Sequence, residues 1–181
     1  MYDFKVNEKW HQLTFYNTTD SAYAIGCYLS GEEIKSAALR LCPDKSYHIH
    51  DFWDDFYVGK FKGTDRLEQV LLPGEARMMS VHEVEPNPQF ISTNRHIMQG
   101  YVDLAKYPEW DGAKNELSGI SKVVGGEIYK VVIALNGFEP VKAEAHTKVK
   151  IKVLDEKMDL AELSIESKKN EDIPWSITFK K

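Results

Sequence analysis

The stretch Val149-Lys150-Ile151-Lys152-Val153-Leu154 alternates apolar side chains with lysines, so one side of an extended chain is apolar and the other charged. Successive side chains of a β-strand point to opposite faces, and such alternation is therefore typical of a strand with one buried face. Residues 160–165 repeat the pattern a few positions later. Similar runs recur along the 181-residue chain, and no segment of about 12 or more residues keeps a helical period. The sequence therefore predicts an all-β fold.

Other strands are expected where short apolar or alternating runs are bounded by turn residues. These runs are residues 10–16, 23–29, 46–53, 56–61, 67–72, 76–84, 90–92, 97–104, 127–135, 141–145 and 175–179. Turn signals between them include Pro73-Gly74, Gly125-Gly126 and Asn136-Gly137. Residues 34–41 fit two helical turns or a short strand equally well.

Composition changes along the chain and indicates two domains. Residues 1–105 hold 15 of the 21 aromatic residues and all four arginines, whereas every basic residue of 106–181 other than histidine is lysine. The connection, residues 106–115, carries Tyr107-Pro108 and Asp111-Gly112. Because short strands joined by Gly/Pro turns must bury a face against a second sheet, we expect two consecutive β-sandwich units. The predicted units are 1–105 and 106–181, the second immunoglobulin-like.

Charge and hydropathy exclude several partners. A net charge of −5 argues against a general nucleic-acid binder, which needs a basic face. The longest apolar runs, such as residues 131–135, are far shorter than the roughly 20 residues of a membrane helix, so no membrane span is expected. Met1 is followed by Tyr2-Asp3-Phe4 without a basic and then apolar leader, so no signal peptide is expected at this start.

Cys27 and Cys42 are too few for a disulfide scaffold, and we interpret both as small core residues. The sequence lacks a Walker loop, a dinucleotide fingerprint, an HExxH motif and a Ser-His-Asp order. No cofactor is therefore expected.

The densest polar cluster is Asp51-Phe52-Trp53-Asp54-Asp55. Two carboxylates about 5 to 10 Å apart across a sugar cleft can hydrolyse a glycoside if one pKa is raised. Oxygen ligands also suit calcium. A turn cap explains three acids before Gly59 better than either, so no catalytic residue is predicted here.

His48 and His50 lie two residues apart and would share one face of a strand, as a two-histidine metal site requires. A third ligand would have to come from His82, His96 or a carboxylate. The favoured interpretation is an outward polar face, with Tyr47, Ile49 and Phe52 pointing inward, and no metal is predicted.

Aromatic residues are the remaining binding candidates, because sugar rings present C–H faces that stack on aromatic rings. Trp110, Tyr107 and Tyr57 are expected in loops or at strand ends, where such platforms can lie. The alternative for each is packing in a core or an interface.

Three segments together resemble a known family. They are Ser46-Tyr47-His48-Ile49-His50-Asp51-Phe52-Trp53 followed by Gly59, then Pro73-Gly74-Glu75-Ala76-Arg77-Met78, then Pro88-Gln89-Phe90-Ile91-Ser92-Thr93-Asn94-Arg95-His96-Ile97-Met98-Gln99-Gly100. Their order and spacing resemble the C-terminal β-sandwich of α-galactosidase-like (melibiase) glycoside hydrolases. The resemblance covers residues 10–104 and departs at Pro73-Gly74-Glu75, where the family commonly has a histidine before the arginine strand.

The resemblance implies a non-catalytic accessory region that braces a catalytic barrel and contacts carbohydrate, with a periplasmic or secreted parent. The barrel would be the partner, since the chain is too short to contain one of about 250 residues. Structural roles are expected for Asp51, Trp53, Arg77, Arg95 and His96. The alternatives are an independent carbohydrate-binding module that uses exposed aromatic residues, and a β protein unrelated to sugars.

Overall fold

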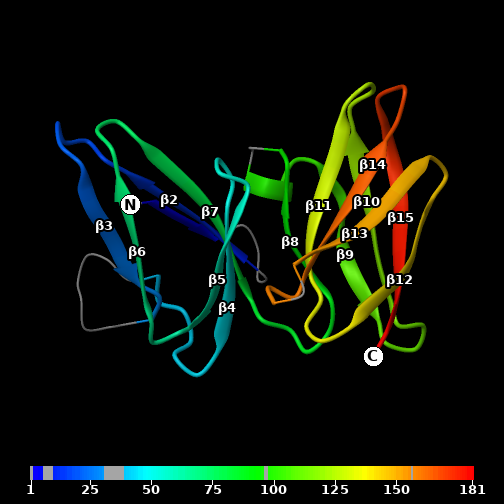
Figure 1. Ribbon diagram of the computed structural model, residues 1–181, viewed down its shortest axis with the longest axis horizontal. Helices are drawn as coiled ribbons and strands as arrows, with labels where there is room; N and C mark the ends of the chain where they lie inside the picture. Colours follow the sequence, from blue (N-terminus) through cyan, green and yellow to red (C-terminus); the bar gives the residue numbers. More distant parts are fainter. Residues whose placement is uncertain (1, 6–9, 31–38, 96–97, 156) are drawn as a thin grey trace. The chain divides into compact units, whose positions relative to one another are not determined.

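The computed structural model describes residues 2–5, 10–30, 39–95, 98–155 and 157–181. These residues form fifteen β-strands and one 3₁₀ turn, and they contain no α-helix (Figure 1). The all-β prediction is confirmed. Within the same ranges, no helix has the length and apolar character needed to cross a membrane.

The chain divides into two compact units, Met1–Val84 and Glu85–Lys181. The division lies earlier than the predicted boundary near residue 105. Strand β8 (Gln89–Thr93) explains the difference, because it pairs with β11 (Ile128–Ala134). Its Phe90 lies in the core of the second unit. The change in composition near residue 105 therefore does not mark the end of the first unit.

The first unit has a five-stranded sheet with the order β1-β2-β7-β4-β5 and a two-stranded sheet of β3 and β6. All pairings in both sheets are antiparallel. The strands are β1 (Tyr2–Lys5), β2 (Trp10–Tyr16), β3 (Tyr23–Tyr28), β4 (Ser46–Asp51), β5 (Phe56–Lys62), β6 (Arg66–Leu71) and β7 (Ala76–Glu83). Residues 34–38 of the ambiguous segment 34–41 lie outside the described residues; Leu39 and Leu41 are buried.

The core of the first unit draws on both of its sheets. Leu13, Ile49 and Val81 come from the five-stranded sheet, and Cys27 and Leu67 come from the two-stranded sheet. The cysteine prediction is confirmed for Cys27, which is buried, and wrong for Cys42, which is exposed. Cys42 follows Leu41 at the entrance to a turn, where its neighbours Pro43 and Asp44 are also exposed.

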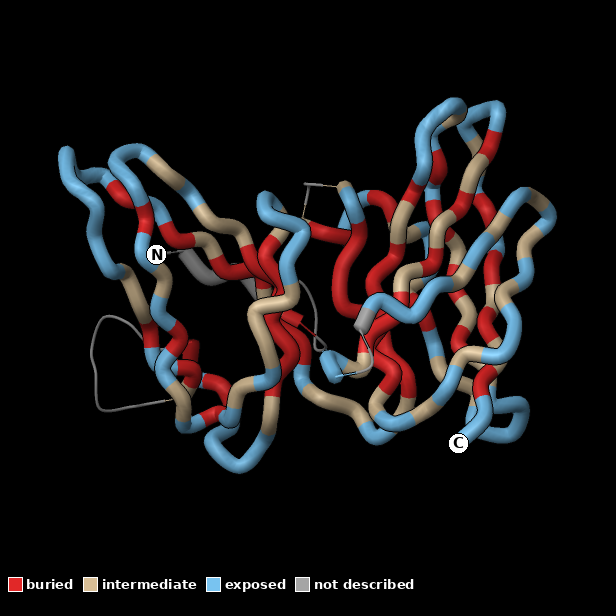
Figure 2. The backbone as a smooth tube through the Cα atoms, viewed as in Figure 1, coloured by how far each residue is buried: buried red, intermediate tan, exposed pale blue. Residues whose placement is uncertain are grey.

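The second unit packs two four-stranded antiparallel sheets face to face, with the orders β12-β15-β10-β9 and β13-β14-β11-β8. The strands not yet given are β9 (Leu104–Asp111), β10 (Glu116–Val123), β12 (Glu139–Ala145), β13 (Lys148–Asp155), β14 (Leu160–Glu166) and β15 (Glu171–Lys180). Buried and less buried positions alternate along β14 and β15 (Figure 2). This alternation places one face of each strand in a shared core, as in a β-sandwich.

Trp175 organises the centre of this core. It lies opposite Gly119 of the neighbouring β10, and its indole Nε1 donates a hydrogen bond of 2.9 Å to Ser121 Oγ. A Cβ on Gly119 would stand 2.9 Å from Cζ2 of Trp175. Two inward positions of β10 are therefore small because one large indole fills the space beside them.

Two segments differ from their predicted structure. The predicted strand 97–104 is wrong for residues 98–103, while residue 97 lies outside the described residues and Leu104 begins β9. Met98–Gly100 is a 3₁₀ turn in which Met98, Gln99 and Gly100 have positive φ. Gly100 is required there, because a Cβ would stand 2.7 Å from Cζ of Phe90. Residues 106–115, predicted as a connection, form most of β9 and the turn that follows it. Pro108 fits β9 because this strand lies at a sheet edge.

Candidate functional site in the β4–β5 turn

The acidic cluster of residues 51–55 forms the tight turn between β4 and β5. The buried carboxylate of Asp51 accepts a 3.2 Å hydrogen bond from the backbone N–H of Asp54. The N–H of Asp55 donates to the carbonyl of Phe52 at 3.2 Å, and Asp55 has a φ of 46°. Asp51 therefore acts as a turn cap, as an acidic side chain at such a position commonly does.

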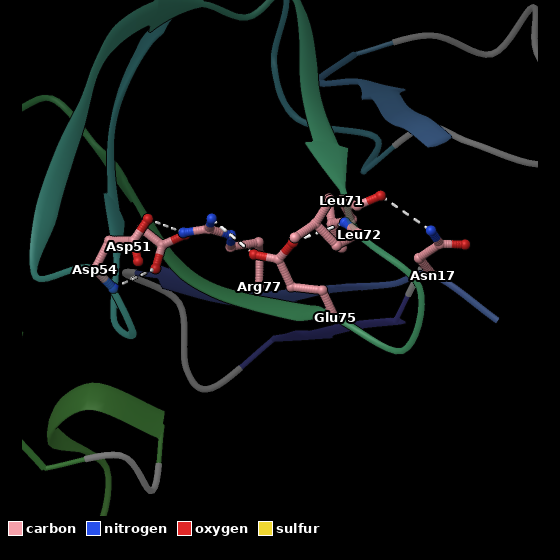
Figure 3. Close-up of polar contacts among 7 residues, drawn as sticks. All are labelled: Asn17, Asp51, Asp54, Leu71, Leu72, Glu75 and Arg77. Carbon is pink, nitrogen blue, oxygen red and sulfur yellow. Dashed lines mark hydrogen bonds and ion pairs between the residues drawn. The ribbon is translucent and has the colours of Figure 1, made fainter. Parts of the chain in front are cut away.

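Arg77, at the start of β7, holds this turn to the sheet (Figure 3). Its guanidinium forms ion pairs with Asp54, with Asp51 at 3.7 Å and with Glu75 at 2.7 Å. The planar fork of arginine donors suits several carboxylates at once. Burial raises the pKa of the Asp51 carboxyl, and the nearby Arg77 opposes that rise.

Glu75 connects this network to the β6–β7 turn (Figure 3). Its Oε2 accepts a 2.8 Å hydrogen bond from the N–H of Leu72, while its other oxygen pairs with Arg77. Asn17, which is buried, donates from Nδ2 to the carbonyl of Leu71 at 3.0 Å. Two turns are thus fixed by a single network of side chains.

The fixed β4–β5 turn presents two exposed aromatic rings. The side chains of Trp53 and Phe56 are 58% and 52% exposed. Phe52 supports Trp53 with an edge contact whose ring centroids are 5.0 Å apart. The structure therefore places Trp53 at the surface, although the sequence predicted a structural role. Phe56 was not predicted as a site residue. The sequence signal that could have identified both residues is the presence of aromatic residues in and beside the acidic turn.

His48 and His50 do not form the expected outward face, because both side chains are buried. A 2.7 Å hydrogen bond joins His48 Nδ1 to the hydroxyl of Tyr57. His82, which pairs with His48 across β4 and β7, is also buried and stacks with Trp10 at 5.3 Å. Ile49 does point into the core, as predicted. Alternation alone predicted that the histidine face of the sheet is exposed, but the side chains on that face are buried as well.

Burial keeps His50 neutral. It lowers the pKa of this histidine to about 4, although the Asp55 carboxylate, 3.7 Å from Nε2, acts in the opposite direction. Among the residues that the structure describes, no group of three or more His, Cys, Asp or Glu side chains is arranged to hold a metal ion. His96, the other proposed third ligand and a predicted structural residue, lies outside the described residues.

Of the three predicted sugar platforms, Tyr57 and Trp110 lie near strand ends, as predicted, whereas Tyr107 lies in the middle of a strand. Tyr57 belongs to β5 and is half-buried. Tyr107 and Trp110 belong to β9 and pack against the core of the second unit. Trp110 contacts Phe138 and Phe179 at centroid distances of 5.4 and 5.7 Å. Burial raises the pKa of Tyr107, and Glu85 adds to this effect. Tyr107 and Trp110 therefore contribute packing area to the second unit.

Arg95, a predicted structural residue, pairs with Glu127 at 2.6 Å. Its backbone N–H donates to the hydroxyl of Thr93 at 3.3 Å. Arg95 thereby links the residues after β8 to the start of β11 within the second unit.

The side chains of the β4–β5 turn are suited to binding a ligand. Asp54 is engaged by Arg77, and Asp51, whose carboxyl pKa is raised by burial, lies beside the same guanidinium. Exposed aromatic faces next to fixed carboxylates and a guanidinium can stack on an apolar ring face and accept or donate hydrogen bonds at its edge.

Comparisons with known protein families and with curated proteins found no match to the chain.

Proposed function

We propose that the chain is a non-catalytic β module that contacts carbohydrate through the β4–β5 turn. The observation that carries this proposal is the exposure of Trp53 and Phe56 on a turn fixed by Arg77. A sugar ring needs an aromatic face for its C–H groups and polar groups for its hydroxyls, and this turn offers both. The resemblance to the accessory β-sandwich of α-galactosidase-like hydrolases is compatible with the same role. An immunoglobulin-like character of the second unit is part of the proposal.

A titration with galactose and galacto-oligosaccharides, followed by amide chemical shifts, tests the proposal. Shallow stacking predicts a Kd of about 1 mM or higher. Trp53→Ala should weaken binding about fivefold, since an aromatic contact contributes about 1 kcal/mol. Tyr101→Ala is the matched control, because Tyr101 is an exposed aromatic residue of the second unit. Equal weakening by both substitutions, or no saturable shift with any sugar, contradicts the proposal.

The chain itself is proposed to have no glycosidase activity. Assays on aryl α- and β-galactosides, glucosides and fucosides should show no turnover. Turnover that disappears in Asp54→Asn or Asp55→Asn would show instead that the acidic turn is an acid/base pair.

A second candidate function, bracing a catalytic barrel, is favoured by exposed apolar side chains along β3 and β6. Tyr23, Val70 and Leu72 are all more than half exposed. Exposed apolar area of this kind is a common feature of docking surfaces. An α-galactosidase-like barrel supplied as a separate protein should then co-elute with the chain in size-exclusion chromatography. The double substitution Val70→Ser and Leu72→Ser should abolish co-elution, whereas Val141→Ser, an exposed valine of the second unit, should not.

A further inference from the structure

One end of the second unit contains a cleft with a volume of about 630 Å³. Three turns surround it: β10–β11, β12–β13 and β14–β15. The first and third of these turns lie side by side (Figure 1). Its volume lies within the range of small-molecule sites, about 300 to 1,000 Å³. Nothing in the β4–β5 turn of the first unit contributes to it.

Hydrogen bonds between the turns fix the shape of the cleft. The N–H of Gly126 donates to the carbonyl of Ser167 at 2.8 Å, and the N–H of Gly125 donates to Asn170 Oδ1 at 2.8 Å. Gly125 allows this approach, because a Cβ there would stand 2.6 Å from Cα of Lys169. On the other side, Thr147 Oγ1 donates to the carbonyl of Glu166 at 2.6 Å. The cleft is therefore preorganised.

The carboxylates of the cleft are paired with cations. Lys148 Nζ lies 2.7 Å from Glu166 Oε1, and Arg95 pairs with Glu127 at 2.6 Å. Glu171 lies 3.4 Å from Lys169 Nζ and 3.3 Å from His146 Nε2, and its other oxygen accepts from Ser167 Oγ at 2.5 Å. The Ser167 hydrogen bond, followed by the His146 and Lys169 contacts, lowers the pKa of Glu171.

One lysine remains after this pairing. Lys168, at the tip of the β14–β15 turn, is exposed and has no carboxylate partner within the described part of the chain. The lining carries three lysines against three glutamates, before any charge on His146 is counted, and Arg95 pairs with Glu127 from outside it. Lys168 is therefore the cation of the lining that is left to meet an anionic ligand, on a chain whose net charge is −5.

We propose that this cleft binds a small hydroxyl-rich carboxylate, a sugar acid of the uronate class. Lys168 would receive the ligand's carboxylate. The paired glutamates and the hydroxyl oxygens of Ser167 and Thr147, whose protons are donated to Glu171 and to the carbonyl of Glu166, would accept hydrogen bonds from its hydroxyl groups. The aliphatic stems of the lysines and the exposed side chain of Ile128 provide apolar surface for its C–H face. This site is independent of the proposed sugar contact at Trp53.

Amide chemical shifts of the full chain, titrated separately with glucuronate, galacturonate, glucose and acetate, test the proposal. Glucuronate or galacturonate should shift the amides of Gly126, Thr147 and Ser167 saturably at millimolar concentrations. Lys168→Gln should weaken this binding about fivefold, as loss of one exposed charge contact predicts. Lys152→Gln is the matched control, because Lys152 is an exposed lysine on β13 outside the cleft and should leave the affinity unchanged.

The remaining outcomes overturn the proposal. Equal affinity for glucose shows that the cationic lysine is irrelevant, and equal affinity for acetate shows that the hydroxyls are irrelevant. Equal weakening by Lys168→Gln and Lys152→Gln shows a nonspecific charge effect. Uronate shifts confined to Trp53 and Phe56 place the sugar at the first unit and remove the cleft as a site.

Discussion

At the scale of single residues, Arg77 is the side chain that holds the candidate sugar site in place. Its guanidinium lies among Asp51, Asp54 and Glu75, and its side chain is only 20% exposed. Replacing it with alanine leaves the buried Asp51 without its cation and releases the turn. Arg77→Ala should therefore lower the free energy of unfolding by about 2 kcal/mol, as loss of charged hydrogen bonds does. Urea denaturation measures the change.

Arg66→Ala is the control for this experiment. Arg66 pairs with Glu68 at the surface, where both side chains are more than 40% exposed. Such pairs contribute less than about 1 kcal/mol. If the two arginine variants were destabilised equally, the Arg77 network would have no special role in the fold.

His50 should make the stability of the chain depend on pH. Its pKa is about 4 in the folded chain against 6.5 for an unperturbed histidine. Between pH 6.5 and 4 the unfolded chain therefore binds a proton that the folded chain does not, and stability falls as pH falls. The full effect is about 3 kcal/mol. A ring-proton titration of His50 by NMR should give a midpoint near pH 4, and a midpoint near 6.5 would contradict the account.

His50→Gln isolates this effect from the other titrating groups. The variant should lose less stability than the parent chain between pH 6.5 and 4, because glutamine does not titrate. Parallel curves for the two proteins would assign the acid sensitivity to another group.

At the scale of the element, β10 shows how one strand is fitted to its neighbour. A Cβ at Gly119 would stand 2.9 Å from Trp175 and 3.2 Å from Cγ of Pro108. Gly119→Ala should therefore destabilise the second unit by about 1 to 3 kcal/mol through overpacking. Gly112→Ala is the control, since its nearest neighbour, Nε1 of Trp110, would be at 3.5 Å. Thermal unfolding compares the two variants, and an unchanged midpoint for Gly119→Ala would contradict this packing.

Regular alternation made most strands predictable. The predicted strand 10–16 has the same bounds as β2, and the predicted strand 160–165 is one residue shorter than β14. Strand β10 was missed because Gly119 and Ser121 occupy inward positions that an alternating pattern would fill with apolar residues. Those small residues are explained by Trp175, which is more than fifty positions away in the chain.

The candidate site was less predictable than the fold. The acidic turn could be found from composition, but its partner Arg77 lies on another strand. The surroundings of the aromatic residues also depend on distant segments. Trp110 sits between charged residues in the sequence yet packs on Phe138 and Phe179, whereas Trp53 follows a strand and is exposed. Exposure depends on contacts between distant segments, which a local pattern does not contain.

At the scale of the whole molecule, each unit has its own core, so the second should fold without the first. All the buried residues of its core cluster lie between Phe90 and Phe179. A protein of residues 85–181 should give dispersed amide shifts and a cooperative thermal transition. A protein of residues 106–181, which starts at the boundary predicted from composition, lacks β8 and part of β9 and should not. Folding of the shorter protein alone would contradict the division after Val84.

The account's central claim is that the β4–β5 turn contacts carbohydrate. Saturation-transfer difference NMR tests this most directly, with the aromatic protons irradiated in the presence of galactose or a galacto-oligosaccharide. We predict transfer to the carbon-bound protons of the sugar that is lost in Trp53→Ala and retained in Trp110→Phe. Transfer that survives in Trp53→Ala, or no transfer from the parent chain, would contradict the claim.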